Sequence, residues 1–388
     1  MTDIIEKVEA FPITIPRKVP YLGPLGEIVP NQKGYFIRPR NKTVYSIHDH
    51  SMLVKITTRD GVVGWGEALC PVSPQVSAKI VDDLLGPLII GRDPQDVVSI
   101  YEDLYSSMQV RGYHGGFFCD ALAAIDIALW DIKGKQLGLP ICKILGGKRR
   151  DKIPAYVSGL PKATVEERAE FALEWIEKGY DAVKFAAAVS YEGEVKEAKA
   201  IRKAIGDGYN ILVDMHWRYS ALEAIALIDK LSEYDIYLAE APVHPQDIDG
   251  QAFVTSRVKT SIGIGEELRN IYEFRERFER RCMNVIQPEM GRLGITAFWN
   301  VCQMAKAYHC KVMPHASIGV GVFQAASLQV SAAVQDLPYH EFQHSTFDTS
   351  LKFLKGNMRC ENGFFTLPDG AGLGVEPIDD MFEFIIIE

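Results

Sequence analysis

The chain has 388 residues, a formal net charge of −9 and 47% hydrophobic residues. These values are ordinary for a soluble globular protein that is large enough for two domains or for one large barrel with additions. The acidic balance and the lack of a basic run argue against nucleic acid or an anionic membrane as the main partner. The seven scattered cysteines form no Cys-x-x-Cys pair, and neither a signal peptide nor a membrane-spanning run is recognisable, so we expect a reduced, cytoplasmic setting.

The first part of the chain predicts an α+β domain over residues 1–150. Residues 3–16 alternate as a strand does, whereas 17–50 are rich in Pro, Gly, Arg, Lys and Tyr and predict a long loop. Asp60-Gly61 separates two β-rich runs, 52–58 and 62–67, which is a strong hairpin signal. From about 74 to 138 the pattern is helical, with Gly138 and Pro140 marking the end.

A regular alternation of apolar runs and amphipathic helical segments begins near residue 153 and predicts a modified (β/α)₈ TIM barrel over 151–354. The tail, 355–388, is turn-rich, and we expect it to return to the first domain. Catalytic groups of such a barrel lie at the C-terminal ends of its strands. The candidate strands are 153–158, 181–185, 210–214, 236–240, 261–265, 283–287, 310–314 and 340–343.

Three evenly spaced acids, Asp214, Glu240 and Glu266, end three successive candidate strands. Parallel strands bring their carboxyl ends to one mouth, where three anions repel one another unless a cation lies between them. Oxygen ligands with room for water and a chelating substrate suit Mg²⁺, and no thiolate joins the set to favour zinc. We therefore predict a Mg²⁺ site formed by these three residues.

The remaining strand ends supply candidate acid/base groups. His216 follows Asp214 by two residues, and strand alternation keeps both on one side. A carboxylate that is bonded to one nitrogen of a histidine fixes its tautomer and raises the basicity of the other, which Glu289 could do for His315. Simpler alternatives stand beside each of these: a buried structural His216, a His315 that shapes a turn, and a Lys184 that is a surface charge. Lys184 and Glu341 end the second and eighth strands.

Together these motifs resemble the enolase superfamily, in its mandelate-racemase-like subgroup, over nearly the whole chain. The hairpin that ends in Gly64-Trp65-Gly66-Glu67 and the helix from Ala124 to Lys135 resemble the family's capping domain. The resemblance implies an N-terminal capping domain that the C-terminal tail completes. It also places Asp214, Glu240 and Glu266 at the metal positions, and matches Pro314-His315 and the closing turn from Pro368 to Gly374.

Departures from the subgroup narrow the expected function. Members often carry Lys-x-Lys on the second strand, whereas this chain has Lys184 followed by Phe185 and Ala186, so a lysine base is missing there. Asp214-Met215-His216 is similar instead to acid-sugar dehydratases of the galactonate-dehydratase type, in which that histidine is the general acid. The sixth-strand residue is usually Asp in the family and is Glu289 here.

The resemblance implies a mechanism for an aldonate or aldarate. The substrate carboxylate and 2-hydroxyl chelate Mg²⁺ beside Lys184, with Glu341 at a carboxylate oxygen. His315, oriented by Glu289, removes the α-proton, and His216 protonates the departing 3-hydroxyl to give a 2-keto-3-deoxy acid. A racemase or epimerase and a cycloisomerase remain alternatives that use the same enediolate, and a non-catalytic sugar-acid binding protein is a further one.

Substrate contacts are expected from the N-terminal loops and from the residue after His216. Arginines in 17–50 could bind a second carboxylate, although a solvated, charged loop explains them equally well. The family resemblance also suggests a symmetric homo-oligomer. The candidate contacts are Arg17, Tyr21, Arg38, Arg40 and Trp217.

Overall fold

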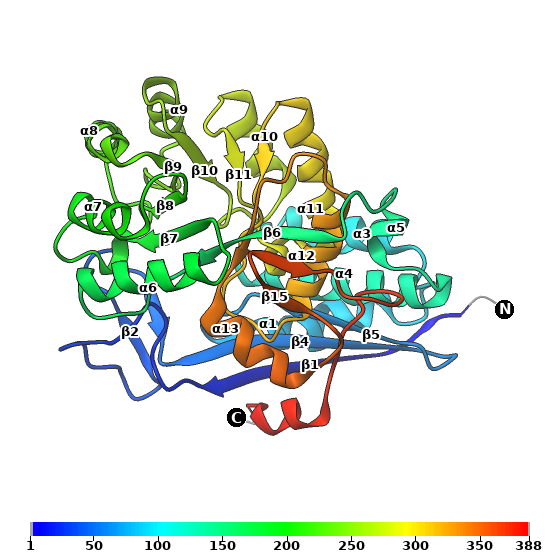
Figure 1. Cartoon of the computed structure of the whole chain (residues 1–388). Coiled ribbons are helices and arrows are strands. Elements are labelled where there is room, and N and C mark those ends of the chain that lie inside the picture. The colour runs from blue at the N-terminus through cyan, green and yellow to red at the C-terminus, as the bar shows by residue number, and fades with distance from the viewer. Residues whose placement is uncertain (1–2, 387–388) are drawn as a thin grey trace.

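The computed structural model describes residues 3–386, as a capping domain and a barrel joined along one side (Figure 1). Hydrogen bonds between the two parts are made by buried groups. The amide of Leu69 donates to the carbonyl of Gly291 over 2.9 Å, and the amide of Thr296 donates to the Asp126 carboxylate over 2.8 Å. Both partners in the barrel belong to α11, so the cap is fixed to the segment that follows the sixth barrel strand.

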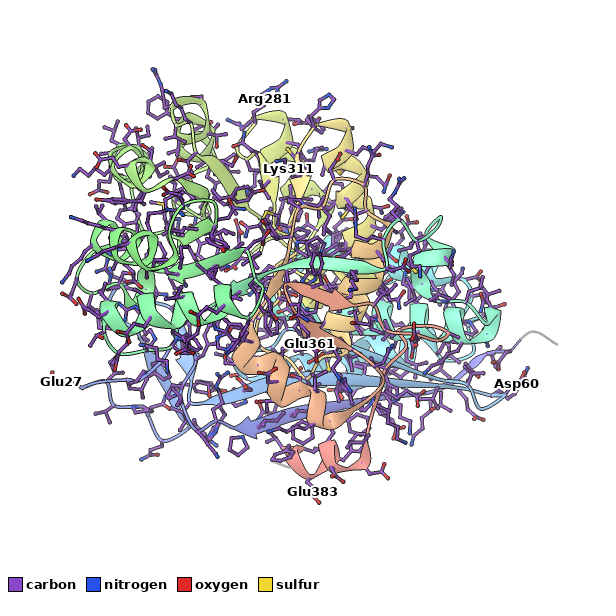
Figure 2. The ribbon with its side chains drawn as sticks, viewed as in Figure 1. Glu27, Asp60, Arg281, Lys311, Glu361 and Glu383 are labelled. Atoms are coloured by element: carbon purple, nitrogen blue, oxygen red, sulfur yellow. The ribbon has the colours of Figure 1, made fainter. Side chains whose placement is uncertain are left out.

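The capping sheet is antiparallel in the order β1-β4-β5, and α4 crosses one face of it. The predicted Asp60-Gly61 turn forms the tip of this hairpin, where Asp60 projects at the edge of the molecule (Figure 2). Side chains at Gly64 and Gly66 would collide with the backbone of α4, which explains both glycines. The elements are β1 (Ile5–Pro16), β4 (His48–Thr58), β5 (Val63–Ala68), α1 (Pro74–Ile80), η1 (Val81–Leu85), α2 (Gly86–Ile89), α3 (Val97–Gln109), α4 (Gly116–Leu137) and α5 (Ile141–Ile144).

The segment 17–50 is not the unbroken loop that its composition predicts. It contains the short hairpin β2 (Tyr35–Ile37) and β3 (Val44–Ser46), and β4 already begins at His48. Strands of three residues that pair only with each other are too short for a periodic signal in the sequence. Leu22, Phe36 and Tyr45 of this segment pack with Ala186 and Val189 at the end of the second barrel strand.

The barrel contains all eight predicted strands in parallel register from β6 to β12, and β13 pairs with β6. The amide of Glu341 donates to the carbonyl of Pro314 over 3.1 Å and joins the end of β12 to β13. The strands are β6 (Lys152–Ser158), β7 (Ala182–Ala186), β8 (Asn210–Asp214), β9 (Ile236–Glu240), β10 (Ser261–Ile264), β11 (Val285–Ile286), β12 (Lys311–Val312) and β13 (His340–Phe342).

Helices between these strands cover the barrel, as the green-to-orange part of Figure 1 shows. Capping boxes begin α6 at Thr164 and α8 at Ser220, so the local sequence sets where these helices start. Among residues 3–386, no helix has the length and apolar character needed to span a bilayer. The segments are α6 (Val165–Glu177), η2 (Ala187–Val189), α7 (Glu194–Ile205), α8 (Ala221–Leu231), η3 (Ser232–Tyr234), α9 (Ile248–Arg257), α10 (Ile271–Glu279), α11 (Met290–Ala307), α12 (Val322–Ala333), α13 (His344–Ser350) and η4 (Leu351–Phe353).

The C-terminal tail contacts both parts of the molecule. β16 extends the barrel sheet by pairing with β6, and the last helical turn lies against β1, where the Phe11 and Phe382 ring centroids are 5.4 Å apart. Asp131 of α4 accepts from the amides of Trp65 and Leu373, tying the tail to the capping sheet. The tail contains β14 (Leu354–Lys355), β15 (Arg359–Glu361), β16 (Phe364–Thr366), β17 (Glu376–Pro377) and η5 (Asp379–Phe384).

Candidate active site

A cavity of about 130 Å³ lies at the C-terminal ends of the barrel strands, under the segment that contains β2 and β3. Residues from the ends of six barrel strands, from the start of α11 and from the cap contribute to its wall, so it has the position that active sites of such barrels take. The polar and charged lining residues are Tyr21, Thr43, Tyr45, Ser158, Lys184, Asp214, His216, Glu266, Arg292, His315, Ser317 and Glu341.

The three predicted metal ligands stand on three adjacent strands. Asp214 and Glu240 are paired neighbours at the ends of β8 and β9. Glu266 follows β10 after Gly265, whose φ of 142° is a conformation that glycine adopts without strain. Asp214 and Glu266 line the cavity directly, and Glu240 lies deeper, 1% exposed.

Lys184 lies between two of the carboxylates. Its Nζ is 2.8 Å from Glu240 Oε2 and 2.8 Å from Glu341 Oε1, and Gln287 donates a further hydrogen bond of 2.7 Å to Glu240. Burial opposes the charged lysine, but the two carboxylates prevail and raise its pKa well above the ordinary value. Lys184 is therefore a fixed cation at the base of the cavity, which excludes the surface role.

His315 is held by carboxylates on both ring nitrogens. Nδ1 is 2.6 Å from Glu289 Oε2 and Nε2 is 2.7 Å from Glu266 Oε2. Glu289 also accepts from the amide of Gly291 over 3.1 Å, which fixes the carboxylate. Burial lowers the pKa of His315, but Glu266 and Glu341 outweigh burial and raise it well above its usual range. The longer side chain of Glu289 thus reaches the histidine.

His216 lies two residues after the end of β8 and lines the same cavity. It has a left-handed backbone with φ 53°, so its ring folds back and Nδ1 lies 3.0 Å from Asp214 Oδ1. Burial opposes protonation, yet Asp214 raises the pKa of His216 above the ordinary value. With Nδ1 directed at Asp214, Nε2 is the nitrogen left for a substrate.

Within residues 3–386, no three carboxylate, imidazole or thiol side chains already stand as a metal-coordinating group. Glu240 is bonded to Lys184 and Gln287, and Glu266 is bonded to His315. The assignment of Asp214, Glu240 and Glu266 as metal ligands therefore stays a prediction. Their position at the ends of three adjacent strands is consistent with it.

The structure separates the predicted substrate contacts. Tyr21 and Trp217 line the cavity, whereas the three arginines do not. Arg17 pairs with Asp49 at 2.7 Å, Arg38 is buried and donates to the carbonyls of Tyr21 and Gly23, and Arg40 pairs with Glu194. These arginines brace the segment 17–50 and do not reach the cavity, because nearby carboxylates and carbonyls already bind them.

Arg292, to which the sequence assigned no role, lines the cavity from the first turn of α11. Its position three residues after Glu289 places the two about one helical turn apart, and this spacing is the signal that could have identified it. The sequence also assigned no role to Glu67. The Glu67 carboxylate accepts from the amides of Val320, Val322 and Phe323 and so holds the start of α12 to the cap.

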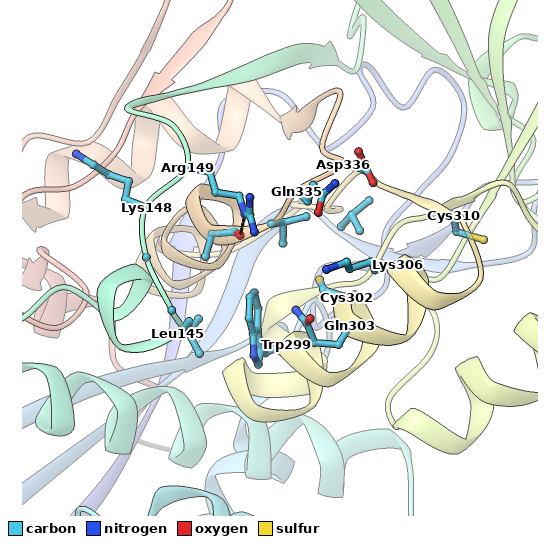
Figure 3. A pocket seen from close by; sticks show the side chains of 15 residues that line it. Leu145, Lys148, Arg149, Trp299, Cys302, Gln303, Lys306, Cys310, Gln335 and Asp336 are labelled. Atoms are coloured by element: carbon cyan, nitrogen blue, oxygen red, sulfur yellow. Dashed lines mark hydrogen bonds between the residues drawn. The ribbon is translucent and has the colours of Figure 1, made fainter.

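A larger cavity, of about 350 Å³, lies near the start of β12, at the N-terminal rather than the C-terminal end of this barrel strand. Figure 3 shows Trp299, Gln303 and Lys306 of α11 beside it, with Arg149 opposite. Among the described residues of its wall, Asp336 is the one carboxylate, and Cys302 and Cys310 are buried thiols whose pKa values are raised by burial. Because no acid/base pair faces it, the smaller cavity is the candidate active site.

The fold and the site together define a capped barrel with acids and two histidines at its mouth. The family models for "Enolase C-terminal domain-like" and for "Mandelate racemase / muconate lactonizing enzyme, N-terminal domain" match residues 167–381 and 28–146. The chain belongs to the enolase superfamily, in its mandelate racemase and muconate lactonizing enzyme branch.

Curated relatives and a solved structure agree with this assignment. The chain is 32% identical to a D-galactarolactone cycloisomerase of Agrobacterium fabrum, over 84% of this chain and 88% of the relative. It is 28% identical to a D-xylonate dehydratase of Haloferax volcanii, over 87% and 85%. A crystal structure described as a putative isomerase from Sinorhizobium meliloti is 49% identical, with a TM-score of 0.97 over 99% of both chains.

Proposed function

We propose that this protein is a Mg²⁺-dependent dehydratase of an acid sugar, an aldonate or an aldarate, that forms a 2-keto-3-deoxy acid. The observation that carries the proposal is the pair of His216 and His315, which line one cavity and are each hydrogen-bonded to a carboxylate. Relatives that act on acid sugars, among them the D-xylonate dehydratase, support the substrate class.

The donor set fits a hard divalent cation. Asp214, Glu240 and Glu266 offer carboxylate oxygens, which are the ligands that Mg²⁺ prefers. Burial raises the pKa of Glu240, Lys184 opposes this, and the nearby charges of Asp214 and Glu266 raise it further. This crowding of like charges is what a bound cation relieves. When bound by these residues, Mg²⁺ would supply positive charge that holds the substrate carboxylate and lowers the pKa of the α-proton.

The side chains of this chain would then move two protons. His315, oriented through Nδ1 by Glu289, removes the α-proton with Nε2, and Lys184 stabilises the negative charge that develops on the carboxylate oxygens. His216 donates a proton from Nε2 to the 3-hydroxyl, which leaves as water. The enol then becomes the 2-keto-3-deoxy acid. Glu341 pairs with Lys184 and accepts a hydrogen bond from the amide of Ala316, and so keeps Lys184 next to the substrate carboxylate.

A cycloisomerase is the second candidate, favoured by the 32% identity to the D-galactarolactone cycloisomerase. In that reaction His315 would remove the same α-proton, and the group that leaves the β-carbon would be the lactone carboxylate rather than a hydroxyl. The site differs little between the two reactions, because both need one base and one acid facing the enediolate. An epimerase would use the same histidines and lose no group.

A substrate screen with two readouts tests the proposal. Protein treated with EDTA and reloaded with Mg²⁺ is given a panel of aldonates, aldarates and aldarolactones in D₂O. We expect semicarbazide-reactive keto acid from at least one aldonate or aldarate, and no product before reloading. If keto acid forms only from a lactone, the protein is a cycloisomerase and the dehydratase proposal is wrong. α-Proton exchange without keto acid would replace it by epimerisation, and binding without exchange would leave a sugar-acid binding protein.

A further inference from the structure

Arg292 is the cation in the cavity wall that lacks an acidic partner. Two Lys or Arg side chains line the cavity among the described residues, Lys184 and Arg292. Lys184 is bound by Glu240 and Glu341, whereas the Arg292 side chain makes no hydrogen bond or ion pair within 3–386, and its Nε is buried without a partner. A guanidinium in this state has donors left for a bound molecule.

Three of the acids near Arg292 are already engaged by other groups, whereas the carboxylate oxygens of a fourth, Glu267, are buried without a hydrogen-bond partner and form no ion pair with Arg292 within 3–386. Asp120 is paired with Arg269 at 2.9 Å, and both Glu266 and Glu289 are bonded to His315. Burial, together with the nearby charge of Arg269, lowers the pKa of Arg292, although Asp120, Glu266 and Glu289 oppose the shift. Leaving a partly buried charge unpaired is costly, and functional sites are where such costs are found.

The position of Arg292 adds to this conclusion. It lies in the single helical turn before Gly294, whose non-helical backbone separates that turn from the rest of α11. The cavity wall beside it is formed by Leu69 and Pro71 of the cap. Lys184 comes from β7, while Arg292 follows β11, with β8, β9 and β10 between them in the sheet. The two cations therefore serve different ends of a molecule that lies across the mouth.

We propose that Arg292 binds a second carboxylate, on the end of the substrate remote from the reacting carbon, and that the substrate is therefore a sugar diacid or its monolactone. This inference rests on the proposed function and narrows it from acid sugars to aldarates. A planar guanidinium matches a carboxylate through two parallel hydrogen bonds. The terminal CH₂OH of an aldonate offers no charge and would leave Arg292 unpaired.

The test compares galactarate with galactonate, which differ at C6 in carrying a carboxylate or a CH₂OH group. Wild-type protein is expected to prefer the aldarate in kcat/KM. Arg292→Met should reduce kcat/KM for the aldarate about 100-fold and for the aldonate less than about 3-fold. Arg292→Lys keeps the positive charge but loses the paired guanidinium donors, and it should retain part of the preference for the aldarate. Arg40→Gln, which alters an arginine outside the cavity, should leave the preference unchanged.

A binding measurement separates failure of this inference from failure of the proposed function. Calorimetry on Mg²⁺-loaded His315→Asn protein, with and without Arg292→Met, gives the Kd of each compound without turnover. If galactarate binds more tightly than galactonate and Arg292→Met removes the difference, the inference is supported. This holds even if the wild type yields no keto acid, a result that would contradict only the dehydratase proposal. Equal losses for both compounds, or a wild-type preference for galactonate, would overturn the role of Arg292, whatever the reaction proves to be.

Discussion

His315 Nδ1 and Glu289 Oε2 are 2.6 Å apart, and this contact fixes which nitrogen of the imidazole faces the cavity. The carboxylate is itself held by the amide of Gly291, so the ring is positioned by a chain of two hydrogen bonds. Such partners of a catalytic histidine set its tautomer and its basicity. Glu289 is therefore a positioning residue, and its effect should be separable from that of the base.

Glu289→Gln should slow α-proton exchange about 100-fold while changing KM little, because the amide no longer favours Nδ1–H and the ring basicity falls. Exchange into D₂O measured by NMR across pH checks this, since loss of the carboxylate should lower the pKa of His315 and shift the acidic limb of the pH profile to lower pH. Glu289→Asp retains the charge and serves as the matched control. A Glu289→Gln protein with the wild-type exchange rate and pH profile would remove Glu289 from the mechanism.

His216→Asn should stop formation of the keto acid and leave exchange of the α-proton in place. The reason is that His315 and His216 act on different protons and are held by different carboxylates, Glu289 and Asp214. Parallel NMR exchange and semicarbazide assays on one protein sample give both rates. His315→Asn is the control and should lose both. Wild-type dehydration by His216→Asn would show that another group protonates the leaving hydroxyl.

The barrel and most of its site could be predicted because each strand is a short apolar run that ends on a polar residue. That pattern put Asp214, His216, Glu266 and His315 at one mouth, and the structure places all four in one cavity wall. The Glu289 contact was predicted as well, but only the structure shows that the longer side chain still reaches His315.

Interactions between segments distant in the sequence could not be predicted from local pattern. The arginines of 17–50 look like substrate ligands until Asp49 and Glu194 are seen beside them. Conversely, no local pattern distinguishes Arg292 from other basic residues, and it stands out only where its unpartnered Nε and the cavity are both visible. Charge in a sequence says little about whether the charge is already paired.

Mg²⁺ should raise the thermal unfolding midpoint of EDTA-treated protein, because a ligand that binds the folded state stabilises it in proportion to the logarithm of its concentration. At 100 times the Kd the added stability is about 2.7 kcal/mol. Glu266→Gln should abolish the response, since it removes a cavity-facing carboxylate charge. Asp120→Asn, which alters a buried acid paired with Arg269, is the control and should respond as the wild type does. An undiminished response in Glu266→Gln would place the metal elsewhere.

Glu67→Gln should change how stability depends on pH. Burial raises the pKa of Glu67 to about 7, although Ser51 and three amides of the barrel oppose the rise. The folded state therefore holds the proton more tightly than the unfolded chain, whose carboxyl has an ordinary pKa near 4.5. Its contribution is fully present below pH ~4.5 and is lost as the pH rises towards ~7, at a slope of up to about 1.4 kcal/mol per pH unit.

Urea unfolding of wild type and Glu67→Gln at pH 5, 6, 7 and 8 measures this dependence as a difference, so that other titrating groups cancel. We expect the variant to be less stable at pH 5 and the gap to narrow up to about pH 7, because the glutamine has no proton to lose. Ser51→Ala removes one donor to Glu67 and keeps the carboxylate, so the slope should persist in it. Parallel stability curves for wild type and Glu67→Gln would mean that this carboxylate stays ionised at the junction of the cap and α12.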